Sequence, residues 1–71
     1  MTDPTPYHWI LTLSAPYGSG KITATNTGTI NALPGQTRES AYEAIYAYCV
    51  EREPRLGNAN VVFFALERNA L

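Results

Sequence analysis

Hydrophobic and polar positions alternate along two stretches in the first half of the chain. Residues 7–14 place Tyr7, Trp9, Leu11 and Leu13 on one side and His8, Ile10, Thr12 and Ser14 on the other. Residues 21–30 place four threonines on one side and, on the other, Ile22, Ala24, Asn26, Gly28 and Ile30. A period of two, rich in β-branched and aromatic residues, predicts two strands.

The segment between these strands, residues 15–20, contains one proline and two glycines and predicts a hairpin loop. The second strand has small side chains and a central glycine. We therefore expect it to lie at an edge of the sheet, with a bulge near Asn26–Gly28.

A helix is predicted from Thr37 to about Glu53. Thr37 is a good N-cap, and Pro54 disfavours helical backbone at the residue before it. At helical spacing, one stripe of side chains should face the sheet: Ala41, Tyr42, Ile45, Tyr48 and Cys49. Tyr46 and Val50 fall outside this stripe, so we expect them to be exposed apolar groups.

Residues 61–66, Val-Val-Phe-Phe-Ala-Leu, form a short apolar run after a turn at 55–60. Such a run predicts a strand that is apolar on both faces. The pattern leaves open which set of side chains faces the helix: Val61, Phe63 and Ala65, or Val62, Phe64 and Leu66.

The element order ββαβ predicts an α+β domain with one helix on a three-stranded sheet, antiparallel or mixed. A right-handed crossover places the third strand beside the first, in the order 2-1-3 and parallel to the second strand. The order 1-2-3 is the alternative, with the threonine-rich strand in the middle. We expect a flexible lead-in at 1–6, the domain at 7–68 and a tail at 69–71.

One helix can cover only one face of this sheet, although strand residues are apolar on both. The uncovered face predicts a non-catalytic interaction module that forms a homodimer or binds a heterologous protein, because large exposed apolar patches are unusual in monomers. The candidate interface residues are Ile10, Thr12, Tyr46, Val50, Phe63 and Phe64.

Composition narrows the alternatives. The chain has 71 residues, one cysteine, one histidine and a net charge of −1, with 5 basic and 6 acidic residues. Neither an internal disulfide nor a metal site is expected, and scarce basic residues make nucleic acid an unlikely partner. A nucleic-acid accessory protein remains the alternative, with an aromatic platform of Tyr7, Trp9 and Phe63 or Phe64. Without an apolar span or an export signal, we expect a cytoplasmic location.

No catalytic or cofactor-binding residues are predicted. Gly18-Ser19-Gly20-Lys21 departs from a phosphate-binding loop, which needs an earlier glycine, a following Ser or Thr, and a helix. His8 and Cys49 should lie on opposite sides of the sheet, so they do not predict a nucleophile and its base. A small enzyme or ligand binder with its site at the 53–60 loop is a third possibility.

Four segments together resemble small proteins of unknown function from Streptomyces-like actinobacteria and from their phages and plasmids. They are residues 7–13 (YHWILTL), residues 34–38 (PGQTR) leading to Tyr42, residues 61–64 (VVFF) and residues 66–69 (LERN). The resemblance implies a bacterial or mobile-element origin and carries no activity and no site residues.

Overall fold

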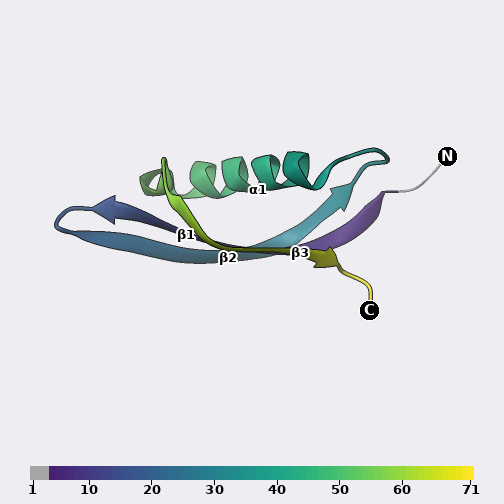
Figure 1. Ribbon diagram of the computed structural model, residues 1–71, viewed down its shortest axis with the longest axis horizontal. Helices are drawn as coiled ribbons and strands as arrows, with labels where there is room; N and C mark the ends of the chain where they lie inside the picture. The colour runs from purple at the N-terminus through teal and green to yellow at the C-terminus, as the bar shows by residue number, and fades with distance from the viewer. Residues whose placement is uncertain (1–3) are drawn as a thin grey trace.

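A computed structural model describes residues 4–71, so residues 1–3 of the expected lead-in lie outside the described residues. Its elements are β1 (Thr5–Tyr17), β2 (Gly20–Ala32), α1 (Arg38–Arg52), the 3-10 helix η1 (Pro54–Leu56) and β3 (Asn60–Arg68). The sheet order is β2-β1-β3, and both outer strands run antiparallel to β1. The predicted α+β fold and strand order 2-1-3 are therefore confirmed (Figure 1).

The β1–β2 hairpin is longer and tighter than the pattern predicted. Its turn contains only Gly18 and Ser19, and the two strands pair without interruption from Tyr17/Gly20 to Thr5/Ala32. Gly18 has φ 61°, a backbone angle that favours glycine at the first position of a two-residue hairpin turn. The bulge predicted near Asn26–Gly28 is wrong, because the β1–β2 register is continuous there.

Two prolines lie inside β1, where they need not interrupt the ladder. Pro6 and Pro16 are two of the residues that direct their backbone groups toward the β3 side of β1. The carbonyl of Pro6 accepts a hydrogen bond from Asn69 N at 3.0 Å, and Pro16 lies beyond the last β1–β3 pair, Ser14/Asn60. The strand can therefore begin at Thr5, inside the segment expected to be flexible.

The helix begins as predicted. Thr37 is its N-cap, with extended backbone angles, and the side-chain oxygen accepts a hydrogen bond from Ser40 N at 3.1 Å. At the other end, Glu53 caps α1 and also begins the η1 turn, which Pro54 opens. The side chain of Leu56 from η1 is completely buried, so this turn closes one end of the core.

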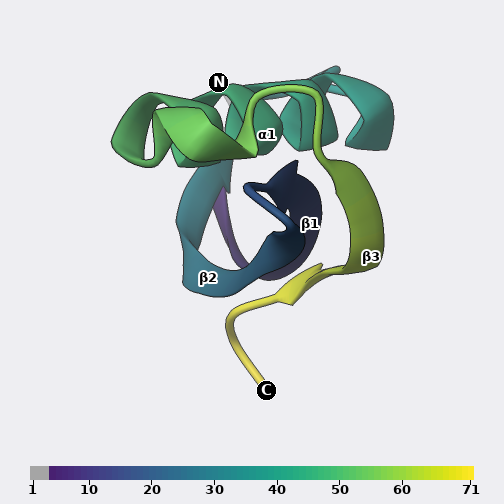
Figure 2. The same cartoon turned by 90° about the vertical axis from the view of Figure 1, so that its left-hand side faces the viewer.

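The molecule has two layers, with α1 lying across one face of a twisted sheet (Figures 1 and 2). Its core is formed by alternate β1 residues, the helix stripe and η1: Trp9, Leu11, Leu13, Ala15, Ile45, Cys49 and Leu56. Ile22, Ala24 and Ile30 from β2 pack against this cluster, as their shared face predicted. Neither view shows a second layer over the sheet face opposite α1 within residues 4–71.

A register shift in β3 answers the question that the apolar run left open. Thr12 pairs with Phe63 and Leu13 pairs with Val61, so Val62 is the extra residue of a bulge. Phe64 and Leu66 consequently pack against the core beneath α1, whereas Phe63 and Ala65 share the opposite face with Ile10 and Thr12. Neither of the two expected sets of side chains faces the helix as a whole.

Candidate functional site: the open face of the sheet

The sheet face opposite α1, here called the open face, is assembled from alternate residues of all three strands. β1 is the central strand and β2 and β3 lie on either side of it. The register places the face's residues in four rows across the sheet: Ser14 with Thr23 and Asn60, Thr12 with Thr25 and Phe63, Ile10 with Thr27 and Ala65, and His8 with Thr29 and Glu67.

Hydroxyl groups on this face bind one another. The Thr12 and Thr25 Oγ1 atoms are 2.8 Å apart, and the hydroxyl of Thr23 donates to Ser14 Oγ at 3.2 Å. These bonds pair the hydroxyls of two rows of the face, which also carries the apolar side chains of Ile10, Ala65 and Phe63. Its centre is therefore less polar than its threonine content indicates.

Charged and titratable groups lie only at the two ends of this face within the described residues. Lys21 pairs with Pro16 beside the hairpin turn, while His8 and Glu67 form a cross-strand pair at the opposite end. The rows between them carry no ionisable side chain. Phe63 has 51% of its surface exposed there, the largest aromatic surface on the face.

Three of the predicted interface residues are thus brought together. Ile10 and Thr12 occupy adjacent rows on β1, and Phe63 lies directly across from Thr12. Phe64 points the other way: its ring packs edge-on against Tyr42, with centroids 5.2 Å apart, and the Arg38 guanidinium lies 5.6 Å from its centroid. Phe64 does not contribute to the open face.

Tyr46 and Val50 lie elsewhere again, on α1. The expectation that they are exposed is wrong, because both side chains are half-buried. Tyr46 packs against the core, and its hydroxyl donates to the carbonyl of Ala59 at 3.3 Å. The segment between η1 and β3 runs beside the helix and covers a flank that the helical wheel left open to solvent.

The aromatic platform expected for a nucleic-acid binder is not assembled. Trp9 is only 4% exposed in the core, and Tyr7 shares its helix-facing side of β1. Among residues 4–71, Phe63 is the one aromatic side chain on the open face. Stacking of successive bases would need several exposed rings.

The residues considered for catalysis are separated. Cys49 is 1% exposed under α1, and its burial raises the pKa of the thiol, whereas His8 is exposed on the open face. Across residues 4–71, no group of three His, Cys, Asp or Glu side chains is placed to hold a metal ion.

The 53–60 turn is occupied by structural contacts. Leu56 fills the core, and the Glu53 carboxylate accepts hydrogen bonds from Arg55 Nε at 2.8 Å and Nη2 at 2.7 Å. Arg55 also lies 5.1 Å from the ring centroid of Tyr17, which ties the turn to the hairpin tip. Two hollows border α1, and neither is lined by residues of this turn.

Sequence reasoning missed two features of the site. It treated the threonines as a ladder without seeing that the hydroxyls of Thr12 and Ser14 pair with them across the strands. It also missed the bulge at Val62, which decides that Phe63 and not Phe64 lies on the open face. No helix in the described part of the chain is long and apolar enough to cross a membrane.

Comparisons with protein-family models, with curated proteins and with solved structures give no match to this chain.

Proposed function

We propose that this protein is a small non-catalytic interaction module that forms a homodimer through the open face of its sheet. The observation that carries the proposal is the uncharged centre of that face, where Ile10 and Ala65 lie beside the exposed ring of Phe63. A second layer over these side chains would remove apolar surface from water. A cytoplasmic setting is part of the proposal and is supported by the single free thiol, Cys49.

The charges at the ends of the face favour a second copy as the partner. In a face-to-face dimer with a two-fold axis across the strands, the Lys21 end of one copy lies over the His8 and Glu67 end of the other. This axis lays β2 over β2, so Lys21 is offset by two strand spacings, roughly 10 Å across the sheet, from the partner subunit's Glu67, and the two charges attract each other weakly while the neutral rows meet. This arrangement is isologous, as expected for a homodimer.

The size of the face sets the expected strength. Three strands at a spacing of about 4.8 Å and eight residues at about 3.3 Å give roughly 400 Å² of projected area. Standard interfaces bury about 800 Å² on each partner, so we expect a weak dimer with a dissociation constant in the micromolar range. Light scattering should therefore span at least a hundredfold range of concentration that extends well above micromolar.

The first test replaces the exposed ring with a charge. Phe63→Glu should raise the dimer dissociation constant at least about tenfold, because it places a carboxylate at the centre of the apolar rows. Leu33→Glu is the matched control, since Leu33 is 62% exposed in the loop after β2, away from the face. A monomeric wild-type protein at all concentrations would contradict the proposal.

The second test addresses the orientation of the two copies. Lys21→Glu and Glu67→Lys should each weaken association by placing like charges together, and the double variant should restore it. Because the residues are solvent-exposed, both effects should shrink as salt is added. A double variant weaker than either single variant would argue against the end-to-end exchange, while leaving the role of Phe63 to be judged separately.

A further inference from the structure

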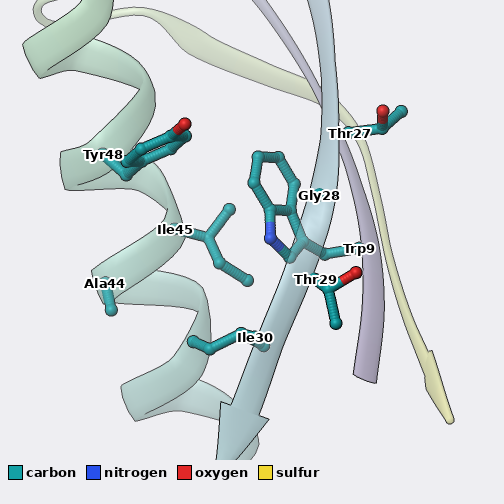
Figure 3. A pocket seen from close by; sticks show the side chains of 8 residues that line it. All are labelled: Trp9, Thr27, Gly28, Thr29, Ile30, Ala44, Ile45 and Tyr48. Atoms are coloured by element: carbon teal, nitrogen blue, oxygen red, sulfur yellow. The ribbon is translucent and has the colours of Figure 1, made fainter. Parts of the chain in front are cut away.

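A groove runs between α1 and β2 on the face of the sheet opposite the proposed dimer surface. It has a volume of about 320 Å³ and lies along β2, one of the two edge strands of the sheet (Figure 3). Its lining comes from the helix, from the middle of β2 and from one central β1 residue: Ala44, Ile45, Tyr48, Thr27, Gly28, Thr29, Ile30 and Trp9. This volume is at the lower end of the roughly 300–1,000 Å³ of small-ligand pockets, and it suits one large side chain.

The walls of the groove are mainly apolar, with one polar group directed into it. Trp9 is only 4% exposed, yet its indole nitrogen faces the space between β2 and α1 (Figure 3). No side-chain N or O atom among residues 4–71 is both fully buried and without a hydrogen-bond partner, so the indole N–H, which has no partner within the protein, keeps contact with water. Tyr48 forms the far wall, edge-on to the indole with centroids 6.0 Å apart.

The strand side of the groove is an unpaired backbone edge. The two residues that flank a two-residue hairpin turn, here Tyr17 and Gly20, form a hydrogen-bonded pair. Every second pair along the ladder from there is also hydrogen-bonded, including Trp9/Gly28. The N–H and C=O groups of Thr27 and Thr29 therefore point away from β1, toward the open edge. The same alternation directs the Pro6 carbonyl away from β2, and that carbonyl indeed accepts its hydrogen bond from Asn69 on the β3 side.

This edge lacks the usual protection against strand addition. β2 is 13 residues long, with no proline and no bulge, and its single charged residue is Lys21 at the turn. Natural edge strands are commonly short, charged, kinked or covered. A long bare edge beside an apolar groove is the arrangement by which peptide-binding domains add a strand and hold alternate side chains.

We propose that the groove between α1 and β2 binds an extended peptide, which adds to β2 as a fourth strand and inserts one large apolar side chain beside Trp9. The peptide residue opposite Gly28 shares the helix-facing side of the sheet, so its side chain enters the cavity. Its neighbours exchange backbone hydrogen bonds with Thr27 and Thr29. The indole of Trp9 packs directly against Gly28, which has no side chain to push it away, and the indole N–H donates to a peptide carbonyl.

A second copy of β2 would fill this groove poorly. The helix-facing residues at the centre of β2 are Ala24, Asn26 and Gly28, which are small or polar. A partner segment with a large apolar residue at the matching position buries more surface. The peptide site and the proposed dimer face lie on opposite sides of the sheet, so either proposal can be correct if the other is wrong.

The experiment selects binders from a displayed library of random short peptides and measures synthetic copies by NMR. Binding should shift the signal of the single indole N–H and slow hydrogen exchange at the amides of Thr27 and Thr29. The amide of Thr23, on the same edge beyond the groove, should exchange unchanged. Selected peptides should share a large apolar residue.

Two pairs of variants test the geometry. Thr27→Pro removes an outward N–H and should weaken peptide binding at least about tenfold, whereas Thr23→Pro on the same edge should not. Ala44→Trp, at an exposed helix position, fills the groove and should weaken binding similarly; Ala47→Trp, on the solvent side of α1, is its control. Circular dichroism verifies that each variant is folded, and the alanine pair retains the test if a proline variant unfolds.

Three results would overturn the proposal. One is failure to select any peptide whose binding depends on Ala44→Trp or Thr27→Pro. Another is a set of NMR shifts that map to Ile10, Thr12 and Phe63 instead of the groove. The third is concentration-dependent protection of Thr27 and Thr29 without peptide, which would assign the edge to a second copy of the chain.

Discussion

The indole ring of Trp9 lies against Gly28, its partner across the β1–β2 register, and occupies the space that a side chain there would need. A Cβ built on Gly28 would stand 2.7 Å from Cζ2 and 2.9 Å from Cε2 of the ring. Glycine inside a strand weakens it, and a close approach by another group is one of the reasons to find it there. The same contact places the indole beside Tyr48, so Gly28 also shapes the groove.

Gly28→Ala should therefore destabilise the fold by about 1–3 kcal/mol, as overpacking of a well-packed core does. The indole is buried between sheet and helix, so it cannot simply move into solvent. Urea unfolding measures the change. Gly20→Ala is the control, because a Cβ there meets nothing within 4 Å and its backbone needs no positive φ.

A double-mutant cycle identifies the cause. In a Trp9→Phe background, the smaller ring leaves room for the new methyl group, and the penalty of Gly28→Ala should fall clearly below its value in the wild type. An equal penalty in both backgrounds would show that strand propensity, rather than contact with the indole, explains the cost.

The alternation of side chains predicted both faces of the hairpin correctly because a strand repeats every two residues. The pattern could not identify the partner of Gly28, since that depends on the register, which the two-residue turn at Gly18 sets. Without the register, a glycine in a strand is most simply explained by a bulge. The actual bulge, at Val62, lies in a uniformly apolar run that contains no signal for an extra residue.

The candidate site was predicted in part for the same reason. Ile10 and Thr12 follow from the period of β1, while the separation of Phe63 from Phe64 needed the register of β3. The error on Tyr46 has another origin. A helical wheel assumes that only the sheet covers the helix, but the chain around Ala59 passes beside it and buries part of the ring.

The hydrogen bond from Tyr46 to the Ala59 carbonyl predicts a stability difference between two tyrosines on α1. Tyr46→Phe should cost about 0.5–1.5 kcal/mol, because it removes a half-buried donor from a carbonyl. Tyr48→Phe should change stability by less than about 0.5 kcal/mol, since Tyr48 is 46% exposed and its hydroxyl contacts only Arg52 at 2.7 Å. Urea denaturation of both variants tests this order; equal costs would contradict it.

The Glu53–Arg55 pair predicts an acid-sensitive contribution to stability. Hydrogen bonds from Arg55 lower the pKa of Glu53 from 4.5 to about 2. The unfolded chain therefore binds the proton more readily, so the stabilisation is complete above pH 4.5 and is lost as the pH falls to about 2. The groups are partly exposed, so the effect should be modest and should weaken in salt.

Thermal unfolding between pH 2 and 6 measures this contribution. Wild type should exceed Glu53→Gln in melting temperature at pH 6, and the difference should shrink toward pH 2. Arg55→Gln removes the cause of the pKa shift, so in that background Glu53→Gln should change the melting temperature by less than it does in the wild type. A gap between wild type and Glu53→Gln that stays constant over this range would exclude the ion pair as its source.

The burial of Cys49 allows a prediction of how α1 separates from the sheet. Its side chain is 1% exposed beneath α1, and burial raises the pKa of its thiol, so little reactive thiolate is present in the folded state. A thiol reagent such as DTNB should therefore modify Cys49 only when α1 leaves the sheet. Because Cys49 packs with the core residues Leu11, Ile45 and Leu56, this opening should coincide with global unfolding.

The comparison is between the free energy of opening, obtained from labelling rates, and the free energy of unfolding in urea; the two should agree. A Cys49→Ala/Ala47→Cys double variant is the control, since Ala47 is exposed on the same helix and its replacement should react at once. If the free energy of opening from Cys49 labelling is well below the free energy of unfolding, α1 detaches from the sheet without global unfolding. The groove beside Trp9 would then have to form anew each time the helix docked.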